Sequence, residues 1–310
     1  MPISRNGALV ILALMPLFFS SNIIFGRAAV DEIGPFTLAF LRWSLTALAL
    51  AILGHRAIRT TYAALRALTW RWFGMAFLGM WVCGALVYWA LVHTSATNGT
   101  LIYTTAPVLI IAIEATRGRT VSFREAVGIV VALLGVVVIV SRGSIEALMN
   151  LEFNGGDLVF VATAVSWAAY SVLLKDARIQ AVPTIASFCA LSAAGAVLLV
   201  PFALYEIATG RTDALSSTAW AQVAGVVVFA SLLPFSAYQM GVRVVGPSLT
   251  GVFLYLLPVY GVGMAVLFLD ESFRTFHAVG IATVLGGVVL ATFPRSTLSR
   301  GKAASSGKAP

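Results

Sequence analysis

AVGIVVALLGVVV, residues 126–138, returns as AVGIATVLGGVVL at residues 278–290. When the chain is shifted by 152 residues, the two stretches match at Ala-Val-Gly-Ile and again at Gly-Val-Val. Each lies within an apolar run, and about 20 apolar residues are enough for a helix to cross a bilayer. The pair therefore predicts two membrane-spanning helices at equivalent places in a duplicated chain.

The duplication extends to other apolar runs. Chance similarity between apolar segments could produce any one match, but a set that keeps its order favours a single duplication with small gaps. Three further matches lie 148 to 151 residues apart, namely Tyr88 with Tyr238, Pro107 with Pro258, and Pro35 with Pro183.

The composition is that of a membrane protein. Of 310 residues, 60% are hydrophobic and 10% charged, and the mean hydropathy is +0.96, which leaves too few charges for the surface of a soluble domain. We expect an all-α membrane protein of ten helices around a central cavity. The expected spans are 7–27, 35–54, 72–92, 97–116, 123–141, 156–175, 185–207, 218–241, 247–269 and 274–293.

The spans divide into two halves, residues 1–146 and 147–294, and a disordered cytoplasmic tail follows at 295–310. Because each half holds five spans, an odd number, the second copy must enter the membrane from the opposite side. The halves are therefore expected to be inverted repeats, the architecture by which secondary transporters alternate access. The first apolar run is interpreted as a retained span, because it is long for a signal peptide and contains Pro16 and Asn22.

The net charge of +8 reflects membrane topology rather than nucleic-acid binding. With the N-terminus in the cytoplasm, fifteen Lys and Arg fall in inner segments and four in outer loops, so both termini are predicted to be cytoplasmic. Cys83 and Cys189 lie inside apolar runs without a motif for a disulfide or a metal. No catalytic motif and no cofactor motif is found, so an enzyme is not expected.

Three segments carry a family resemblance: GPFTLAFLRW (34–43), NGTLIYTTAPVLIIAIEA (98–115) and SFREAVGIVVALLGVVVIV (122–140). With their second-half copies they resemble the EamA family of the drug/metabolite transporter superfamily, most closely its YddG-type exporters of aromatic and other neutral amino acids. The resemblance implies a basket in which spans 1, 3, 4, 6, 8 and 9 line the cavity and spans 5 and 10 brace it. It also implies efflux across a bacterial inner membrane.

Polar and aromatic side chains in mid-span are the candidates for substrate binding, because unpaired polar groups are costly in hydrocarbon. Asn22 suits the charged groups of an amino acid, although an interhelical hydrogen bond explains it equally well. Trp81 and Tyr88 are two helical turns apart, and Trp167 shares a face with Tyr170. The predicted substrate-binding residues are Asn22, Trp81, Tyr88, Tyr103, Trp167, Tyr170, Tyr238, Gln239 and Tyr255.

Prolines in mid-span predict kinks that serve gating, since each removes a helical hydrogen bond. They are Pro107, Pro234 and Pro258, and Pro107 and Pro258 recur in both halves. Arg42 is the one base inside a span, and its repeat counterpart is Ala190. It either extends towards the outer face, bonds to backbone carbonyls, or pairs with the outer-loop acids. Because the resemblance implies an arginine at this position throughout the family, we expect a structural or gate role for it rather than direct substrate binding.

These features together favour a secondary transporter that exports neutral, chiefly aromatic, amino acids and related metabolites. No acid at mid-span argues for facilitated export or exchange, and the lack of paired bases argues against phosphorylated substrates. A broad exporter of drugs or toxic cations is the alternative within transport, and a membrane-embedded enzyme is the alternative outside it. The expected partners are small metabolites and the lipid bilayer; the sequence leaves the oligomeric state open.

Overall fold

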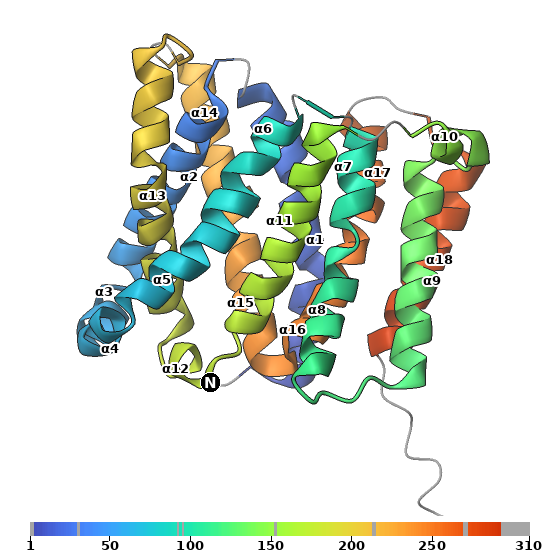
Figure 1. The fold of residues 1–310 in the computed structure, drawn as a ribbon, viewed down its shortest axis with the longest axis horizontal. Helices are drawn as coiled ribbons and strands as arrows, with labels where there is room; N and C mark the ends of the chain where they lie inside the picture. Colours follow the sequence, from blue (N-terminus) through green and yellow to red (C-terminus); the bar gives the residue numbers. More distant parts are fainter. Residues whose placement is uncertain are drawn as a thin grey trace, which may run out of the picture.

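Helices dominate the computed structural model, which describes residues 3–29, 32–91, 93–94, 96–151, 154–212, 215–268 and 272–292; these residues include no strand. Nine stretches of this described part are long and apolar enough to cross a membrane, and they coincide with the second to tenth expected spans. A further helix of 25 residues, α1 (Arg5–Ala29), occupies the place of the first. The long helices stand side by side (Figure 1).

Six of the long helices are uninterrupted. Their starts follow from local sequence: Pro35 opens α2, where its missing N–H is not needed, and Asn154 and Asp157 form a capping box at the start of α11. These helices are α1, α2 (Pro35–Leu53), α9 (Phe123–Val140), α11 (Gly155–Leu173), α13 (Thr184–Ala208) and α18 (Thr275–Thr292).

The third and eighth expected spans each contain a π-helical segment. The third consists of α5 (Thr69–Ala76), the π-helix η1 (Phe77–Leu86) and α6 (Val87–Leu91). The eighth consists of α14 (Ser217–Val227), the π-helix η2 (Val228–Leu232) and α15 (Leu233–Val245). A shift of 150 residues carries η1 onto residues 227–236, a range that includes η2.

The fourth and ninth expected spans are broken helices. In the fourth, α7 (Ala96–Tyr103) gives way to α8 (Ala106–Thr116) through a turn at Thr104 and Thr105. In the ninth, α16 (Pro247–Val252) is followed by the 3₁₀ segment η3 (Phe253–Leu256) and by α17 (Leu257–Phe268). Pro107 and Pro258 each stand just after the break, as the second residue of α8 and of α17.

Short helices outside the expected spans complete the chain. They are α3 (His55–Thr60), α4 (Tyr62–Ala67), α10 (Ile145–Met149) and α12 (Ala177–Gln180).

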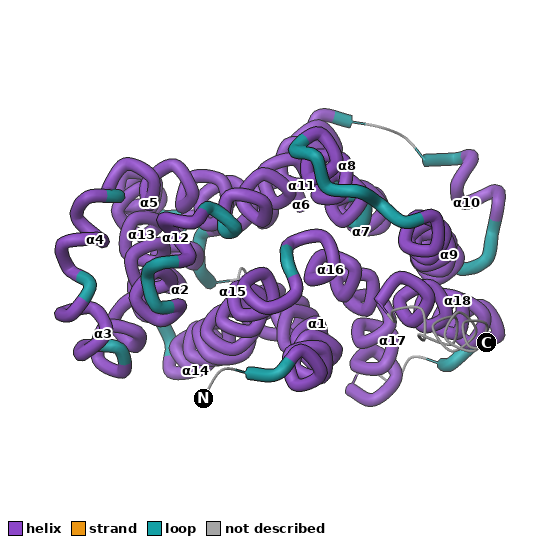
Figure 2. The backbone as a smooth tube through the Cα atoms, turned by 90° about the horizontal axis from the view of Figure 1, so that it is seen from below, coloured by secondary structure: helices purple, strands orange, loops and turns teal. Residues whose placement is uncertain are grey.

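The pair α9–α18 stands at one end of the molecule, as both views show (Figures 1 and 2). Glycines let the two backbones approach closely. A Cβ on Gly287 would lie 2.6 Å from the carbonyl oxygen of Gly128, and one on Gly135 would lie 2.8 Å from that of Gly280. Side chains cannot fit at such distances, so the small residues set the packing, as they do in many membrane helix pairs.

The pair α2–α13 stands at the other end (Figure 2). The rings of Phe36 and Phe202 stack with centroids 5.2 Å apart. Near them the buried Glu206 accepts hydrogen bonds from the backbone N–H of Thr37 at 2.7 Å and from its hydroxyl at 3.0 Å. A carboxylate at the start of α2 is favoured by the positive end of the helix dipole.

Between these two pairs, α1 and α11 occupy equivalent positions. Helix α1 packs against α14, η2 and α15 and against α17, which belong to the second half, while α11 packs against η1, α6, α7 and α8 of the first half. The core lies along these contacts, and its largest fully buried side chains include Trp43, Tyr170, Tyr238 and Tyr255. Outward faces carry exposed apolar residues such as Val130 and Leu134, each 55% exposed, as expected where lipid replaces water.

Candidate functional site

Six aromatic side chains meet in the middle of the bundle and form what we call the Trp167 cluster. Trp167 is 2% exposed and lies at the centre. The other rings lie with centroids 4.9 to 6.5 Å from its own, within the range of favourable aromatic contacts. The members are Phe19 of α1, Tyr103 of α7, Trp167 and Tyr170 of α11, and Phe235 and Tyr238 of α15.

Hydroxyl and amide groups lie at the edge of the Trp167 cluster. The hydroxyls of Ser171 and Tyr238 are 2.6 Å apart and share a hydrogen bond. The side-chain amide of Gln239 donates to the hydroxyl of Tyr170 at 3.4 Å. The cluster thus combines a large apolar surface with a few neutral polar groups, the composition typical of small-molecule sites.

A second group, the Arg42 cluster, joins four spans through hydrogen bonds. The guanidinium of Arg42 donates from Nε to Ser231 Oγ at 2.6 Å, from Nη1 to the Tyr88 hydroxyl at 3.3 Å, and from Nη2 to the Ala230 carbonyl at 2.8 Å. The Tyr88 hydroxyl in turn donates to Asn22 Oδ1 at 2.7 Å. The Arg42 cluster therefore links α1, α2, α6 and η2.

Arg42 is 5% exposed, so it does not extend to the outer face; of the alternatives set out above, bonding to a backbone carbonyl is the one observed. Its guanidinium also lies over two rings, 4.6 Å from the centroid of Trp43 and 5.7 Å from that of Phe235. Glu32, one candidate acid, instead accepts from the Ser216 hydroxyl at 3.1 Å. Asp31, the other, lies outside the described residues.

The irregular segments supply several of these groups. Ala230 and Ser231 belong to η2, and Tyr88 is the second residue after η1. Pro234 comes two residues after η2, within the first turn of α15. Tyr255 lies in η3, fully buried, and its hydroxyl has no hydrogen-bond partner among the described residues. π-Helical segments of this kind occur frequently at functional sites.

The structure separates Trp81 from Tyr88, which the sequence predicted to share a face. That prediction assumed 3.6 residues per turn, but η1 is π-helical and its period is longer. Trp81 stacks on Phe77 with centroids 5.2 Å apart and contacts Phe202 of α13 at 5.3 Å, whereas Tyr88 bonds to Arg42. Among the described contacts Trp81 therefore belongs to neither cluster.

Several members of the two clusters were not identified from the sequence, namely Phe19, Phe235 and Ser231. A signal existed for Phe19, because a shift of 148 residues places it on Trp167. The two rings touch, with centroids 6.1 Å apart. The expected repeat therefore pairs Phe19 with the central residue of the cluster, a signal that the sequence analysis did not use.

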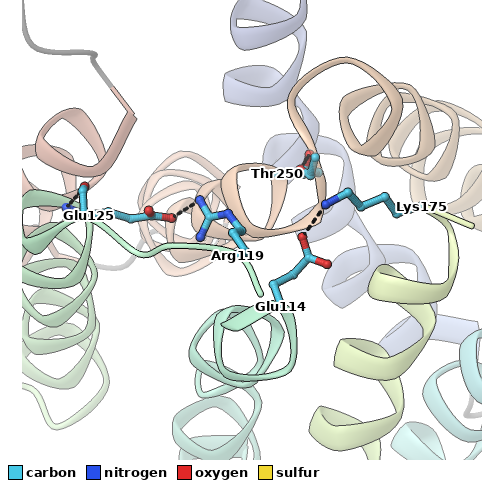
Figure 3. Close-up of polar contacts among 7 residues, drawn as sticks. Glu114, Arg119, Glu125, Lys175 and Thr250 are labelled. Atoms are coloured by element: carbon cyan, nitrogen blue, oxygen red, sulfur yellow. Dashed lines mark hydrogen bonds and ion pairs between the residues drawn. The ribbon is translucent and has the colours of Figure 1, made fainter. Parts of the chain in front are cut away.

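Ion pairs gather at the end of the molecule where α8 leads into α9 (Figure 3). Lys175 pairs with Glu114 at 2.9 Å and joins α11 to α8, and Arg119 pairs with Glu125 at 2.7 Å. A cavity of about 580 Å³ opens beside Arg119. None of the residues that line it belongs to the Trp167 cluster or the Arg42 cluster, so it is distinct from both.

Comparison with known proteins gives consistent matches along the chain. The sequence model of the EamA-like transporter family matches residues 6–141 and 154–293. An uncharacterized transporter of Bacillus subtilis, YyaM, is 26% identical over 91% of this chain and 92% of its own. A probable terminal-alkyne amino-acid exporter of Streptantibioticus cattleyicolor is 27% identical over 90% of each chain.

A solved crystal structure superposes with a TM-score of 0.75 at 23% identity and covers 93% of this chain and 98% of the other. At that level of identity the likeness establishes the fold alone.

Proposed function

This chain belongs to the EamA-like transporter family, and from that premise we propose that it exports neutral, chiefly aromatic, amino acids by alternating access. Its family and its named relatives are transporters rather than enzymes. The observation that carries the substrate proposal is the Trp167 cluster, a buried aromatic surface with neutral polar groups. The name of the Streptantibioticus relative, an amino-acid exporter, supports the same substrate class.

The two halves, residues 1–146 and 147–294, are proposed to be inverted repeats. The glycine contacts of α9 and α18 support this. A shift of 152 residues turns Gly128 into Gly280 and Gly135 into Gly287, so the contact Gly128–Gly287 becomes the contact Gly280–Gly135, which also occurs. The two helices run antiparallel through these contacts, and only a two-fold axis across them exchanges the two pairs.

Contacts between other helices also agree with an exchange of the two halves by a two-fold axis. Helix α1 packs against the eighth and ninth spans, and its counterpart α11 packs against the third and fourth. The two stretches that match the family, 6–141 and 154–293, also fall on the two halves. We therefore propose α1 as a tenth span, and the bias of Lys and Arg supports a topology with both termini in the cytoplasm of a bacterial cell. Residues 295–310, which lie outside the described residues, are proposed to be a cytoplasmic tail.

Alternating access is proposed to use the irregular spans. The π-helices and the breaks before Pro107 and Pro258 occur in both halves, as expected of paired discontinuous helices in transporters. The Arg42 cluster joins spans of both halves and is proposed to act as a gate that holds them together. A cavity at the Trp167 cluster would then form when the spans separate.

The test is flux of labelled amino acids into proteoliposomes that contain the full chain. We expect phenylalanine and tryptophan to cross faster than in empty vesicles. If phenylalanine, tryptophan, methionine and threonine all fail to do so, the amino-acid proposal is wrong. Protection of cells against methyl viologen without amino-acid flux would instead favour the alternative, a broad exporter of drugs or toxic cations.

A further inference from the structure

Arg42 carries a buried positive charge for which the described residues provide no negative partner. All three of its hydrogen bonds go to neutral oxygens, those of Ser231, Tyr88 and Ala230. The three ion pairs among the described residues do not include it. A charge inside a membrane protein is normally paired, and one that is not marks a functional site.

The buried carboxylates of the described residues are already bound elsewhere. Glu206 accepts from Thr37, and Asp157 accepts from the side-chain amide of Asn98 at 3.1 Å. Glu114, in the last turn of α8, forms an ion pair with Lys175, and Glu125, in the first turn of α9, forms one with Arg119. The anion that would balance Arg42 is therefore not supplied by these groups.

We propose that Arg42 binds the carboxylate of the transported molecule, so that this transporter selects carboxylate-bearing substrates and rejects their neutral or cationic analogues. This inference rests on the proposed transport of amino acids and names the residue that recognises their acidic group. It also goes against the alternative of toxic cations, because a fixed buried cation repels a cationic substrate.

The geometry of Arg42 suits this role. A guanidinium presents a planar fork that can bind both oxygens of a carboxylate, and such charge-assisted bonds are stronger than those to hydroxyls. The neutral oxygens that now hold Arg42 are therefore weaker acceptors that a carboxylate can replace. They lie on α6 and η2, so their replacement breaks the hydrogen bonds that tie these two segments to Arg42 of α2. Substrate recognition by Arg42 would in this way be coupled to the proposed gate, in addition to the structural role expected from the sequence.

The position of Arg42 connects it to the aromatic site. The ring of Phe235 lies 5.7 Å from the guanidinium carbon and packs edge-on to Trp167 with centroids 5.6 Å apart. A molecule whose carboxylate is held by Arg42 can thus extend along Phe235, a member of the Trp167 cluster, towards Trp167. An aromatic amino acid has this shape, with an acidic group at one end and a ring at the other.

The test compares phenylalanine with phenylalaninamide, in which a neutral carboxamide of similar size replaces the carboxylate. Binding to the purified full-length protein is followed by tryptophan fluorescence, and competition against labelled phenylalanine is followed in proteoliposomes. For the wild type we expect phenylalanine to bind at least about tenfold more tightly than the amide. In R42Q we expect this preference to fall to within about twofold, and R42K, which keeps the charge but not the fork, should restore it only in part.

Arg243 offers the matched control. It is also an arginine within a long helix and donates to backbone carbonyls, Gln180 at 2.9 Å and Val182 at 2.6 Å, but it belongs to neither cluster. R243Q should keep the wild-type preference for the acid over the amide. Equal binding of acid and amide by the wild type, or an unchanged preference in folded R42Q, would overturn the proposal.

The two proposals fail in different ways. If the protein carries no amino acid at all, the flux assay shows it, and the proposed function is wrong. Fluorescence with phenylacetate and phenylacetamide then still tests Arg42, because this pair also differs in the carboxylate alone. If R42Q does not fold, as gel filtration would show, R42K takes its place: a preference for the acid reduced from the wild-type value supports the proposal, and an unchanged preference overturns it.

Discussion

Adding one methyl group at Gly287 should weaken the pair α9–α18 in a measurable way. In G287A the new Cβ would lie 2.6 Å from the carbonyl oxygen of Gly128 and 2.7 Å from the Cα of Ala132, several tenths of an ångström closer than ordinary contact. Both atoms belong to the backbone, so the helices must move apart. Overpacking of this kind costs about 1–3 kcal/mol.

The neighbouring glycine provides the control for this prediction. A Cβ on Gly286 would meet nothing within 4 Å, and alanine favours a helix over glycine by about 1 kcal/mol. We expect thermal unfolding in detergent to show a lower Tm for G287A, by roughly 2–4 °C per kcal/mol, and an unchanged or higher Tm for G286A.

The proposed repeat sharpens the test. Gly135 is the counterpart of Gly287 and lies equally close to the opposite backbone, with its Cβ position 2.6 Å from the backbone nitrogen of Val284. G135A should therefore lower the Tm by an amount similar to G287A. A G287A protein as stable as G286A would refute the close packing, and a neutral G135A beside a destabilised G287A would argue against the two-fold relation.

Three further substitutions test other parts of the structure. W167A should weaken phenylalanine binding at least about tenfold, because the ring contacts of Trp167 are lost. W70A, at a residue that is 86% exposed, should leave phenylalanine binding unchanged. If W167A yields no folded protein, Trp167 serves packing rather than substrate binding. E206Q should cost about 1.5–3 kcal/mol, measured as a lower Tm, because the charged acceptor at the start of α2 is lost. The backbone N–H of Arg178 lowers the pKa of Asp176, so the carboxylate stabilises the fold above its ordinary pKa, and this stabilisation is lost as the pH falls through the lowered pKa. The Tm of D176N should therefore decline less than that of the wild type between pH 5 and 3. An equal decline of the two Tm values would contradict this.

Much of the helical arrangement follows from sequence for a physical reason. The bilayer fixes the length of a span, so apolar runs such as 123–141 predict helices such as Phe123–Val140 to within a few residues. The π-helical segments of the third and eighth spans cannot be predicted from the sequence in this way, because an α-helix and a π-helix in a membrane have the same apolar composition. That is why Trp81 and Tyr88 diverge although their spacing suggested one face.

The candidate site was predictable to a lesser degree. Trp167, Tyr170, Tyr238 and Gln239 are polar or aromatic groups in mid-span, and hydrocarbon makes such groups conspicuous in a sequence. The partners of Arg42 were not predictable, because Ser231 is distant in sequence and an ordinary small residue in an apolar run. Contact between distant helices is a tertiary property, and a local pattern shows only that a buried charge needs partners.

The close packing of α9 against α18 has a consequence for biogenesis. Helix α9 comes about half-way along the described residues, yet its main partner, α18, is made about 130 residues after α9 is complete. While the ribosome makes residues 141–274, the glycine face of α9 can meet only lipid or transient neighbours. Assembly at this end of the bundle therefore waits for the synthesis of α18, and nascent chains that stop short of α18 lack the partner that fits this face.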